Sequence, residues 1–433
     1  MESIWWKQAS FPSFPALEGD VKTDVLVIGG GITGLLCAWS LTQAGVDCLL
    51  AEADTLCSGV TGNTTAKITA QHRLVYHKLL NRFGPERTKL ILSANLEAVG
   101  RYRSLCREMD CDFVSKPSYV YTLEDRQSID DELRALYRLG YEASFVPELP
   151  LPFPTAGAVR FSNQAQFHPL KFLSRLAREL RIYEHTPVLR LEGMEAVTSR
   201  GRIRAEQIIV ATHFPFLNRH GAYFLKLYQH RSYVLALENA PDLGGMYVDD
   251  DSKGLSFRNT EDGLLLLGGG SHRTGGQSGN WDVLSTFAHL HYPAAREVCR
   301  WATQDCMSLD EVPYIGRYGR HTPRLYVASG FNKWGMTSAM VAAELLTDLV
   351  LGRENKYAAA FRPDRSALRP QLAVNAFEAT ANLLSFSTKR CPHMGCALRW
   401  NKAEHTWDCP CHGSRFTQQG ELINNPATHD AKL

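Results

Sequence analysis

The sequence has little charge imbalance and no long apolar run. Its 47 Lys and Arg and its 45 Asp and Glu residues leave a net charge of +2. Nucleic acids and anionic membranes recruit proteins through clustered basic charge, so neither partner is expected. No apolar run approaches the roughly 18 to 20 residues that span a bilayer, which excludes a transmembrane segment. Internal repeats and low-complexity tracts are also absent from the sequence.

The first residues do not resemble a signal peptide. Met-Glu-Ser-Ile-Trp-Trp-Lys lacks the basic segment followed by an apolar segment that secretion signals share. We therefore expect a cytoplasmic protein. With 44% apolar and 21% charged residues the composition is that of an ordinary soluble enzyme, and 433 residues fit two or three domains.

Most of the eleven cysteines are scattered along the chain. In apolar or helical surroundings such residues are usually reduced thiols that are buried or half-buried. This interpretation covers Cys37, Cys48, Cys57, Cys106, Cys111, Cys299 and Cys306. The remaining four lie between residues 391 and 411, close to two histidines, and indicate a different chemistry.

A nucleotide-binding pattern lies near the start of the chain. Residues 24–28 form a short β-branched apolar run, which is typical of a buried parallel strand. They lead into Gly29-Gly30-Gly31-Ile32-Thr33-Gly34, then a helical stretch (35–44) and a second strand (47–51) that ends at Glu52. Strand, glycine-rich turn, helix, strand and acid in this order form a dinucleotide fingerprint.

Each part of the fingerprint has a physical task. Gly29 permits the tight turn, Gly31 lets a pyrophosphate approach the backbone, and Gly34 lets helix and strand pack closely. The helix N-terminus then faces the phosphates, and Glu52 can bind the ribose hydroxyls. The predicted nucleotide contacts are Gly29, Gly31, Ile32, Thr33, Gly34 and Glu52.

The following segments indicate FAD as the nucleotide. Residues 58–69 are small and rich in hydroxyls, so they offer hydrogen bonds to a pyrophosphate or an isoalloxazine ring. This segment resembles the one that follows the ribose-binding acid in the D-amino-acid oxidase/glycine oxidase superfamily of FAD enzymes. Residues 208–215 and 325–337 resemble later FAD-binding pieces of the same superfamily. The resemblance covers nearly the whole chain and is closest to members with a C-terminal Rieske domain, which are related to the glutamylputrescine oxidoreductases.

The resemblance implies a set of further FAD contacts. They are Ser58, Thr64, Thr65, Ala66, Lys67, Val188, Ala211, Thr212, Gly330, Asn332, Lys333, Trp334, Gly335, Met336 and Thr337. Some superfamily members attach FAD covalently through a cysteine. Cys299 and Cys306 flank that position without filling it, so non-covalent FAD is expected.

The resemblance also implies the fold class and the domains. We expect an α/β protein (α+β overall) in which a Rossmann-like FAD-binding domain is interleaved with an antiparallel-sheet substrate domain, followed by a small all-β Rieske-like unit. The expected bounds are 1–75, 156–216 and 299–352 for the FAD domain, 76–155 and 217–298 for the substrate domain, 353–388 for a linker and 389–433 for the Rieske-like unit.

Candidate catalytic residues are less specific. Superfamily members pass a hydride from a C–N bond to the flavin, while the protein binds and orients the substrate. An amino-acid substrate needs a cation for its carboxylate, and the arginine fork of Arg231 or Arg273 suits that geometry. Lys67 and Lys333 lie inside flavin segments and could contact the polar edge of the ring, and His72 is a further candidate. A structural or surface role is the alternative for each of them.

A second nucleotide site is not predicted. Gly268-Gly269-Gly270 follows an apolar strand (264–267), but the next glycine of the motif is displaced to Gly275 and no helix is evident. This counts against a reductase that is supplied with electrons by NAD(P)H.

The C-terminal stretch carries a metal-binding pattern. Cys391 and His393 form one pair and Cys409 and His412 another, with fifteen residues between His393 and Cys409. This spacing resembles the two binding loops of a Rieske domain, in which two histidines replace two cysteines on one iron of a [2Fe–2S] cluster. Zinc or no metal are the alternatives, although zinc usually takes its cysteines in C-x₂₋₄-C pairs.

Two implications of the Rieske resemblance are less secure. Cys396 and Cys411 would form a disulfide between the loops, as in one large Rieske subgroup, yet disulfides are unusual in the cytoplasm. The stretch before Cys391 is also short and looks helical, so the expected domain is abridged.

Together these features predict an FAD-dependent dehydrogenase. A small amine or amino acid would reduce FAD, and the cluster would pass electrons singly to a protein or quinone acceptor. The alternatives are an oxidase that reduces O₂ to peroxide and keeps a structural cluster, and a non-catalytic electron-transfer or redox-sensing protein.

Overall fold

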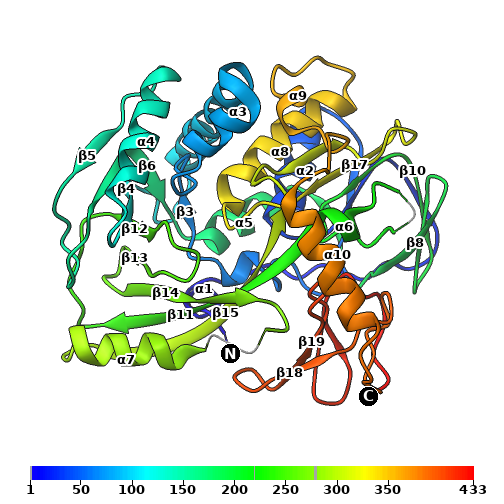
Figure 1. Ribbon diagram of the computed structural model, residues 1–433. Helices are drawn as coiled ribbons and strands as arrows, with labels where there is room; N and C mark the ends of the chain where they lie inside the picture. Colours follow the sequence, from blue (N-terminus) through cyan, green and yellow to red (C-terminus); the bar gives the residue numbers. More distant parts are fainter. Residues whose placement is uncertain (1, 219, 277–279) are drawn as a thin grey trace.

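The computed structural model describes residues 2–218, 220–276 and 280–433. The expected domain ranges also include Met1, Arg219 and residues 277–279, which lie outside the described residues. Three β-sheets organise the chain, and the smallest lies at the C-terminal end (Figure 1). Among the described residues no helix is both long enough and apolar enough to cross a membrane.

The first sheet is built on parallel strands from distant parts of the chain. Its order is β16 (Tyr314–Arg317), β17 (Leu325–Ser329), β10 (Arg202–Val210), β1 (Val21–Ile28), β2 (Cys48–Ala51) and β7 (Arg181–Tyr183). The hairpin β8 (Val188–Glu192) and β9 (Glu195–Thr198) joins it beside β10. Residues 25–28 of β1 are all buried, as a strand covered on both faces requires. This sheet carries the glycine-rich turn.

The second sheet is mostly antiparallel. Its order is β15 (Arg296–Ser308), β11 (Leu227–Glu238), β14 (Leu265–Arg273), β13 (Ser256–Asn259), β12 (Met246–Asp249), β4 (Val114–Thr122), β6 (Gly157–Gln166) and β3 (Lys67–Ile68), with β5 (Ser144–Val146) beside β6. In β11 half-buried positions alternate with buried ones from Leu227 to Tyr233, so successive side chains contact different neighbours on the two faces.

Helices cover the sheets and connect them. They are α1 (Ile4–Gln8), α2 (Ile32–Gln43), α3 (Tyr76–Leu105), α4 (Arg126–Arg138), α5 (Pro169–Ala177), α6 (Tyr223–Lys226), α7 (Trp281–His291), α8 (Gly335–Val350), α9 (Ala358–Phe361) and α10 (Pro370–Leu383), with 3₁₀ turns at Thr61–Asn63 and Cys106–Glu108. Helices α2 and α8 pack against each other beside the first sheet, and α7 lies on the outer side of the second sheet (Figure 1).

Two strands of the second sheet lie at expected domain boundaries, and these boundaries stay predictions. The strand β6 was expected in the FAD domain, which would resume at residue 156, but it pairs with β4 and β3 in the second sheet. Likewise β15 was expected to start the last FAD piece at residue 299, but it pairs along its length with β11. Both strands are long, and they remain in the second sheet until residues 166 and 308, where the chain returns to the first sheet. We therefore propose that the crossings lie after these strands.

The C-terminal unit confirms the expected small all-β fold. Four short strands, β18 (Arg399–Asn401), β19 (Thr406–Asp408), β20 (Arg415–Phe416) and β21 (Leu422–Asn424), pair in chain order. The expected linker is largely ordered, because α9 and α10 lie within it. Figure 1 shows α10 leading from α9 down to this unit.

Candidate functional site

The glycine-rich turn has the geometry that the fingerprint predicts. Gly29 has a φ of 110°, and a Cβ there would lie 2.7 Å from the carbonyl oxygen of Ala211. A Cβ on Gly34 would lie 1.8 Å from the carbonyl oxygen of Gly29, so only glycine permits this contact between α2 and β1. Gly31 caps α2, and the amide of Ile32 donates to Oγ1 of Thr61. Thr61 is a contact that the sequence pattern did not indicate.

The acid at the end of β2 is held beside the turn. Oε2 of Glu52 accepts from the amide of Gly30 at 2.5 Å, and Oε1 accepts from the amide of Asp54 at 2.9 Å. Burial raises the pKa of Glu52, and these two backbone donors oppose that effect. The carboxylate is thereby fixed at the carboxyl edge of the parallel strands, where a dinucleotide ribose would lie.

The half-buried Lys67 and the buried Arg258 lie close together, and neither forms an ion pair with a carboxylate of the described residues. Nζ of Lys67 has Oγ1 of Thr65 at 3.3 Å, and the guanidinium of Arg258 donates to the carbonyl of Ala66 at 3.1 Å. Burial, and then the charge of Arg258, lowers the pKa of Lys67 to about 7. Nε of Arg258 is buried without a partner. Buried charges are normally paired, so this site fits an anionic group such as those of FAD. Arg258 was missed because it lies on β13, far from the flavin segments in sequence.

The last flavin segment leaves open space at the start of α8. Asn332 and Lys333 have φ values of 52° and 76°, so the backbone turns sharply here. The amide of Asn332 donates to the carbonyl of Cys306, which ties the turn to β15. A Cβ on Gly335 would meet no atom within 4 Å. The N-terminus of α8 therefore has room for a ligand and a dipole that favours negative charge.

His72 and Trp334 line the same region. Their rings stack at 5.0 Å with an angle of 5° between planes. Nε2 of His72 donates to the carbonyl of Thr69 at 3.0 Å and lies 3.0 Å from Oγ1 of Thr337. Burial lowers the pKa of His72 to about 3, so the ring is neutral near pH 7. It is a packed residue of the flavin segments and not a surface histidine.

The other expected FAD contacts differ in burial. Ala66, Val188, Ala211, Gly330, Met336 and Thr337 are buried, Thr64, Thr65 and Thr212 are half-buried, and Ser58 is exposed. Cys306 is buried and Cys299 is half-buried, and both are free thiols. Non-covalent attachment of FAD stays a prediction.

Lys333 lies in a small cluster of polar groups on the face of the second sheet. Its Nζ donates to Oγ of Ser271 at 2.5 Å and to Oγ of Ser232 at 3.1 Å. Burial lowers the pKa of Lys333 to about 8, partly offset by Asp305. His230 lies opposite Asp305 in the β11–β15 register. We keep Lys333 as a candidate substrate contact and add Asp305, which the sequence pattern did not indicate.

The structure places Arg231 elsewhere. Its guanidinium makes a bidentate ion pair with Glu404 of the C-terminal unit, and Glu404 also binds Arg415. The Arg231 side chain is only 7% exposed. Burial would raise the pKa of Glu404, but the two guanidinium groups outweigh it and hold this pKa at about 2. Since Arg231 is engaged by Glu404, we do not retain it as a substrate-binding residue.

Arg273 also contacts the C-terminal unit. It donates to the carbonyl of Pro410 at 3.4 Å and to Oδ1 of Asn375 at 3.1 Å, and it lies over the ring of Tyr228 at 5.0 Å. Pro410 stands between Cys409 and Cys411, so this arginine helps to hold a cysteine-bearing loop. Its expected role as a carboxylate binder is likewise not retained.

The two cysteine–histidine loops contain the same hydrogen-bonded turn. The amide of Gly395 donates to the carbonyl of Cys391, and the amide of Gly413 donates to the carbonyl of Cys409, both at 2.9 Å. Gly395 and Gly413 have φ values of 78° and 83°, where glycine is favoured. The loops bring the thiols of Cys391 and Cys409 into a hydrogen bond, which lowers the pKa of Cys391 and raises that of Cys409. Thiolates are the form of cysteine that binds iron.

Two histidine rings face each other across the same site. The rings of His393 and His412 have centroids 4.9 Å apart. Nε2 of His412 donates to the carbonyl of Phe224 at 3.0 Å, and Nε2 of His393 donates to Oδ1 of Asn218 at 2.9 Å. Both Nδ1 atoms are buried without a partner. A neutral imidazole with its proton on Nε2 has a free lone pair on Nδ1, so this donor set fits a metal centre with two thiolates and two imidazoles.

The second pair of cysteines is joined in the structure. Cys396 and Cys411 form a disulfide across the two loops. The sulfur atoms of Cys396, Cys409 and Cys411 lie within 4.8 Å of one another. Two of these three are already bonded to each other, so proximity alone does not make this trio a ligand set. We propose Cys391, His393, Cys409 and His412 as the ligands.

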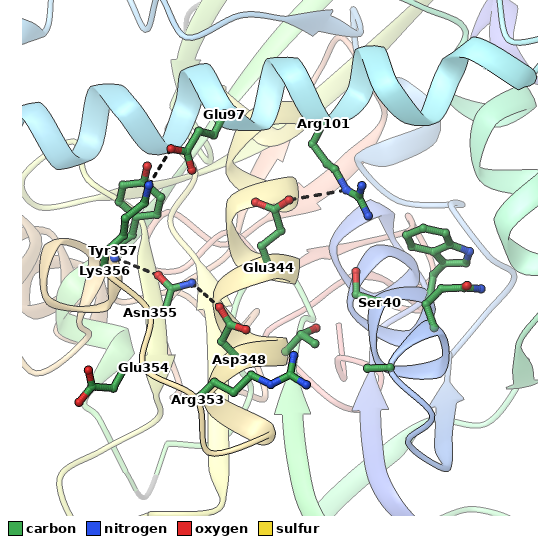
Figure 2. Close-up of a pocket in the computed structure, with 14 residues that line it drawn as sticks. Ser40, Glu97, Arg101, Glu344, Asp348, Arg353, Glu354, Asn355, Lys356 and Tyr357 are labelled. Atoms are coloured by element: carbon green, nitrogen blue, oxygen red, sulfur yellow. Dashed lines mark hydrogen bonds and ion pairs between the residues drawn. The ribbon is translucent and has the colours of Figure 1, made fainter.

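One surface pocket lies away from these residues. Figure 2 shows a surface pocket of about 670 Å³ between α3 and α8, with residues of α2 at one side. Its walls carry ion pairs between Lys356 and Glu97 and between Arg101 and Glu344. None of the predicted site residues is among those that line it. We therefore do not assign this pocket to the flavin.

Comparisons with known proteins agree with both halves of the site. A family model described as FAD dependent oxidoreductase (DAO) matches residues 24–349, and a Rieske [2Fe-2S] domain model matches residues 371–432. The chain is 36% identical to the "Putative Rieske 2Fe-2S iron-sulfur protein YhfW" of Bacillus subtilis, over all of this chain and 97% of that protein.

More distant relatives share the larger part. Gamma-glutamylputrescine oxidoreductase of Escherichia coli is 22% identical over 80% of this chain and 88% of its own length. The crystal structure of glycine oxidase from Geobacillus kaustophilus superposes with a TM-score of 0.65 at 20% identity, covering 80% of this chain and 99% of that one. The chain thus belongs to the DAO family of FAD-dependent oxidoreductases, with FAD as its flavin cofactor, and carries a C-terminal Rieske domain with a [2Fe–2S] cluster.

Proposed function

We propose that the protein is a dehydrogenase that oxidises a C–N bond of a small amine or amino acid and delivers the electrons through its Rieske unit to an acceptor. The cytoplasm is the compartment that we propose for it. One observation carries the proposal: the histidines of the cluster site point toward the segment between β10 of the first sheet and β11 of the second, where Nε2 of His412 donates to the carbonyl of Phe224 and Nε2 of His393 to Oδ1 of Asn218. An electron donor and an electron relay would then lie on two sides of one interface.

The reaction balances with a one-electron or two-electron acceptor. The substrate C–N bond loses two electrons and two protons and becomes an imine, which water hydrolyses. Bound FAD supplies two-electron chemistry and the cluster one-electron chemistry. Two molecules of an acceptor protein, or one quinone, take the electrons.

In this proposal the chain's own residues bind the cofactor and orient the substrate. Lys67 and Arg258 offer positive charge to the cofactor, and the amides at the start of α2 and α8 face its polar groups. Lys333, held by Ser232 and Ser271, is the cation that we assign to an anionic group of the substrate. The names of glycine oxidase and gamma-glutamylputrescine oxidoreductase support amine or amino-acid substrates.

A substrate panel tests the proposal. Amines and amino acids are mixed with the holoprotein without oxygen, and flavin absorbance is followed. We expect one class to bleach the flavin, and reoxidation by O₂ to be slow compared with reoxidation by an artificial one-electron acceptor. Rapid reoxidation by O₂ that is unaffected by Cys391→Ser would favour the oxidase. Failure of every substrate, with the cluster still redox-active, would favour a non-catalytic electron-transfer or sensing protein.

A further inference from the structure

Strand β11 has one face toward the flavin segment and the other toward the Rieske unit. Ser232 contacts Lys333 of the flavin segment. Its neighbour Arg231 points the opposite way and binds Glu404 of the Rieske unit. Gln229 lies on the same side as Arg231 and donates to the carbonyl of His412 at 2.6 Å. The strand therefore contacts both the flavin segment and the Rieske unit.

Two glutamines form the contact with the second cluster loop. Nε2 of Gln304, on β15, donates to the carbonyl of Gly413 at 2.8 Å and to Oε1 of Gln229 at 2.7 Å. Oε1 of Gln304 accepts from Oγ1 of Thr274 at 3.2 Å. Each glutamine is only 2% exposed. Because all these amide groups have partners, both side chains are held in one orientation.

The loop also packs tightly on this pair. A Cβ on Gly413 would lie 2.8 Å from Cβ and Cδ of Gln229, so the loop backbone rests directly on that side chain. His412 is held from the other side by the carbonyl of Phe224, five residues before Gln229. One short segment of chain thus fixes the position of a cluster ligand at two points.

The same glutamines are close to the flavin segment through the backbone. Gln304 is two residues from Cys306, whose carbonyl accepts from the amide of Asn332 at 3.0 Å. Asn332 in turn accepts from the amide of Ser308 at 2.8 Å through its Oδ1. A movement of β15 at this point would therefore displace both the turn before α8 and the loop that carries His412.

We propose that Gln229 and Gln304 are positioning residues for electron transfer from flavin to cluster, holding the second cluster loop against the strands that also hold the flavin segment. The inference rests on the proposed function. One electron at a time passes from the flavin, reduced by substrate, to the oxidised cluster, and it leaves to the acceptor before the second follows. The glutamines carry no electron; they fix the separation of the two centres.

Gln304→Met tests the inference in the holoprotein. Methionine keeps the length and removes the donors to Gly413 and Gln229. The flavin is photoreduced by a laser flash with EDTA as electron donor, and cluster absorbance is followed in time. We expect the rate of cluster reduction to fall severalfold, because electron transfer slows as the separation of the two centres grows. Gln229→Met should also slow the transfer, since it removes the bond to His412.

The matched control is Gln207→Met. Gln207 lies in the first sheet, donates to the carbonyl of Val350 and accepts from the hydroxyl of Tyr326, but has no contact with the cluster loops. Its variant should transfer electrons at the wild-type rate. The EPR line shape of the chemically reduced cluster should change in Gln304→Met at unchanged iron content, and not in Gln207→Met.

Two outcomes overturn the inference. Wild-type rates and line shapes in both glutamine variants would show that Gln229 and Gln304 do not position the second cluster loop. No cluster reduction in the wild-type protein would contradict the proposed function itself, and the inference with it. If Gln304→Met loses the cluster, hydrogen–deuterium exchange replaces the flash experiment. Faster exchange confined to residues 409–416 would support the inference, and faster exchange throughout the chain would contradict it.

Discussion

Arg231 and Glu404, 173 positions apart in the chain, form a bidentate ion pair in which Nε lies 2.8 Å from Oε1 and the second nitrogen donates to Oε2. Arg415 binds the same carboxylate and also Asp408. The pair joins the second sheet to the Rieske unit at a buried point. Arg231, a candidate substrate residue in the sequence, is therefore part of the interface between the two redox sites.

Removal of the Glu404 charge should loosen the Rieske unit. Glu404→Gln leaves two guanidinium groups buried with less compensation, and breaking a buried pair costs about 3 to 5 kcal/mol. Urea unfolding followed by cluster absorbance, which reports on this unit, should show that loss. Glu97→Gln is the control, because its pair with Lys356 is at least half exposed and should contribute less than about 1 kcal/mol. Equal stabilities of the two variants would contradict the assigned role.

The same carboxylate predicts how stability depends on pH. The pKa of Glu404 is about 2 in the folded protein against an ordinary value of 4.5. A lowered carboxyl pKa contributes stability that is fully present above about 4.5 and is lost as the pH falls toward 2, up to about 3 kcal/mol. The difference in unfolding free energy between wild type and Glu404→Gln should therefore be constant from pH 7 to 5 and shrink below pH 4.5. A difference that grows on acidification would be inconsistent with the ion pair.

Loss of a cluster ligand should remove the cluster without affecting FAD binding. Cys409→Ser should abolish the [2Fe–2S] cluster, measured as iron and acid-labile sulfide, while FAD remains bound. Cys299→Ser provides the control, since Cys299 is a half-buried free thiol outside the loops, and it should keep both cofactors. FAD should leave either protein on acid denaturation, as a non-covalent cofactor does. Flavin that stays on the precipitated chain would refute that expectation.

Filling the space at the start of α8 should displace FAD without unfolding the chain. A Cβ added to Gly335 would have no atom within 4 Å, so Gly335→Val is sterically free in the protein alone but should reduce FAD content strongly. Gly100→Val is the matched control for Gly335→Val, because Gly100 is an exposed glycine of α3 with equally open surroundings. This variant should keep its FAD. Full FAD occupancy in Gly335→Val would show that the flavin does not use this space.

Local patterns could be predicted from the sequence, and long-range pairings could not. The turn from Gly29 to Gly34 and the loops at Cys391 and Cys409 are short segments whose backbone geometry depends on glycines inside them. By contrast, Arg231 and Arg273 are bound by Glu404 and Pro410, which are far away in the chain. An arginine's partner cannot be read from its neighbours, so both arginines remained plausible substrate contacts.

The domain boundaries are hard to predict from the sequence for a related reason. The segments β6 and β15 look like strands, but sequence alone does not say which sheet a strand joins. Pairing with β4 and β11 decides it. The stretch of α10 looks helical in the sequence, but where this helix packs depends on contacts, here between Asn375 and both Arg273 and Leu225.

Anaerobic mixing with a flavin-reducing substrate, followed by rapid freezing and EPR, tests the central claim most directly. The account predicts that flavin bleaching is followed by the EPR signal of a reduced Rieske cluster, and that Cys391→Ser bleaches without giving that signal. A flavin that is fully reduced by substrate beside a cluster that stays oxidised would contradict the account.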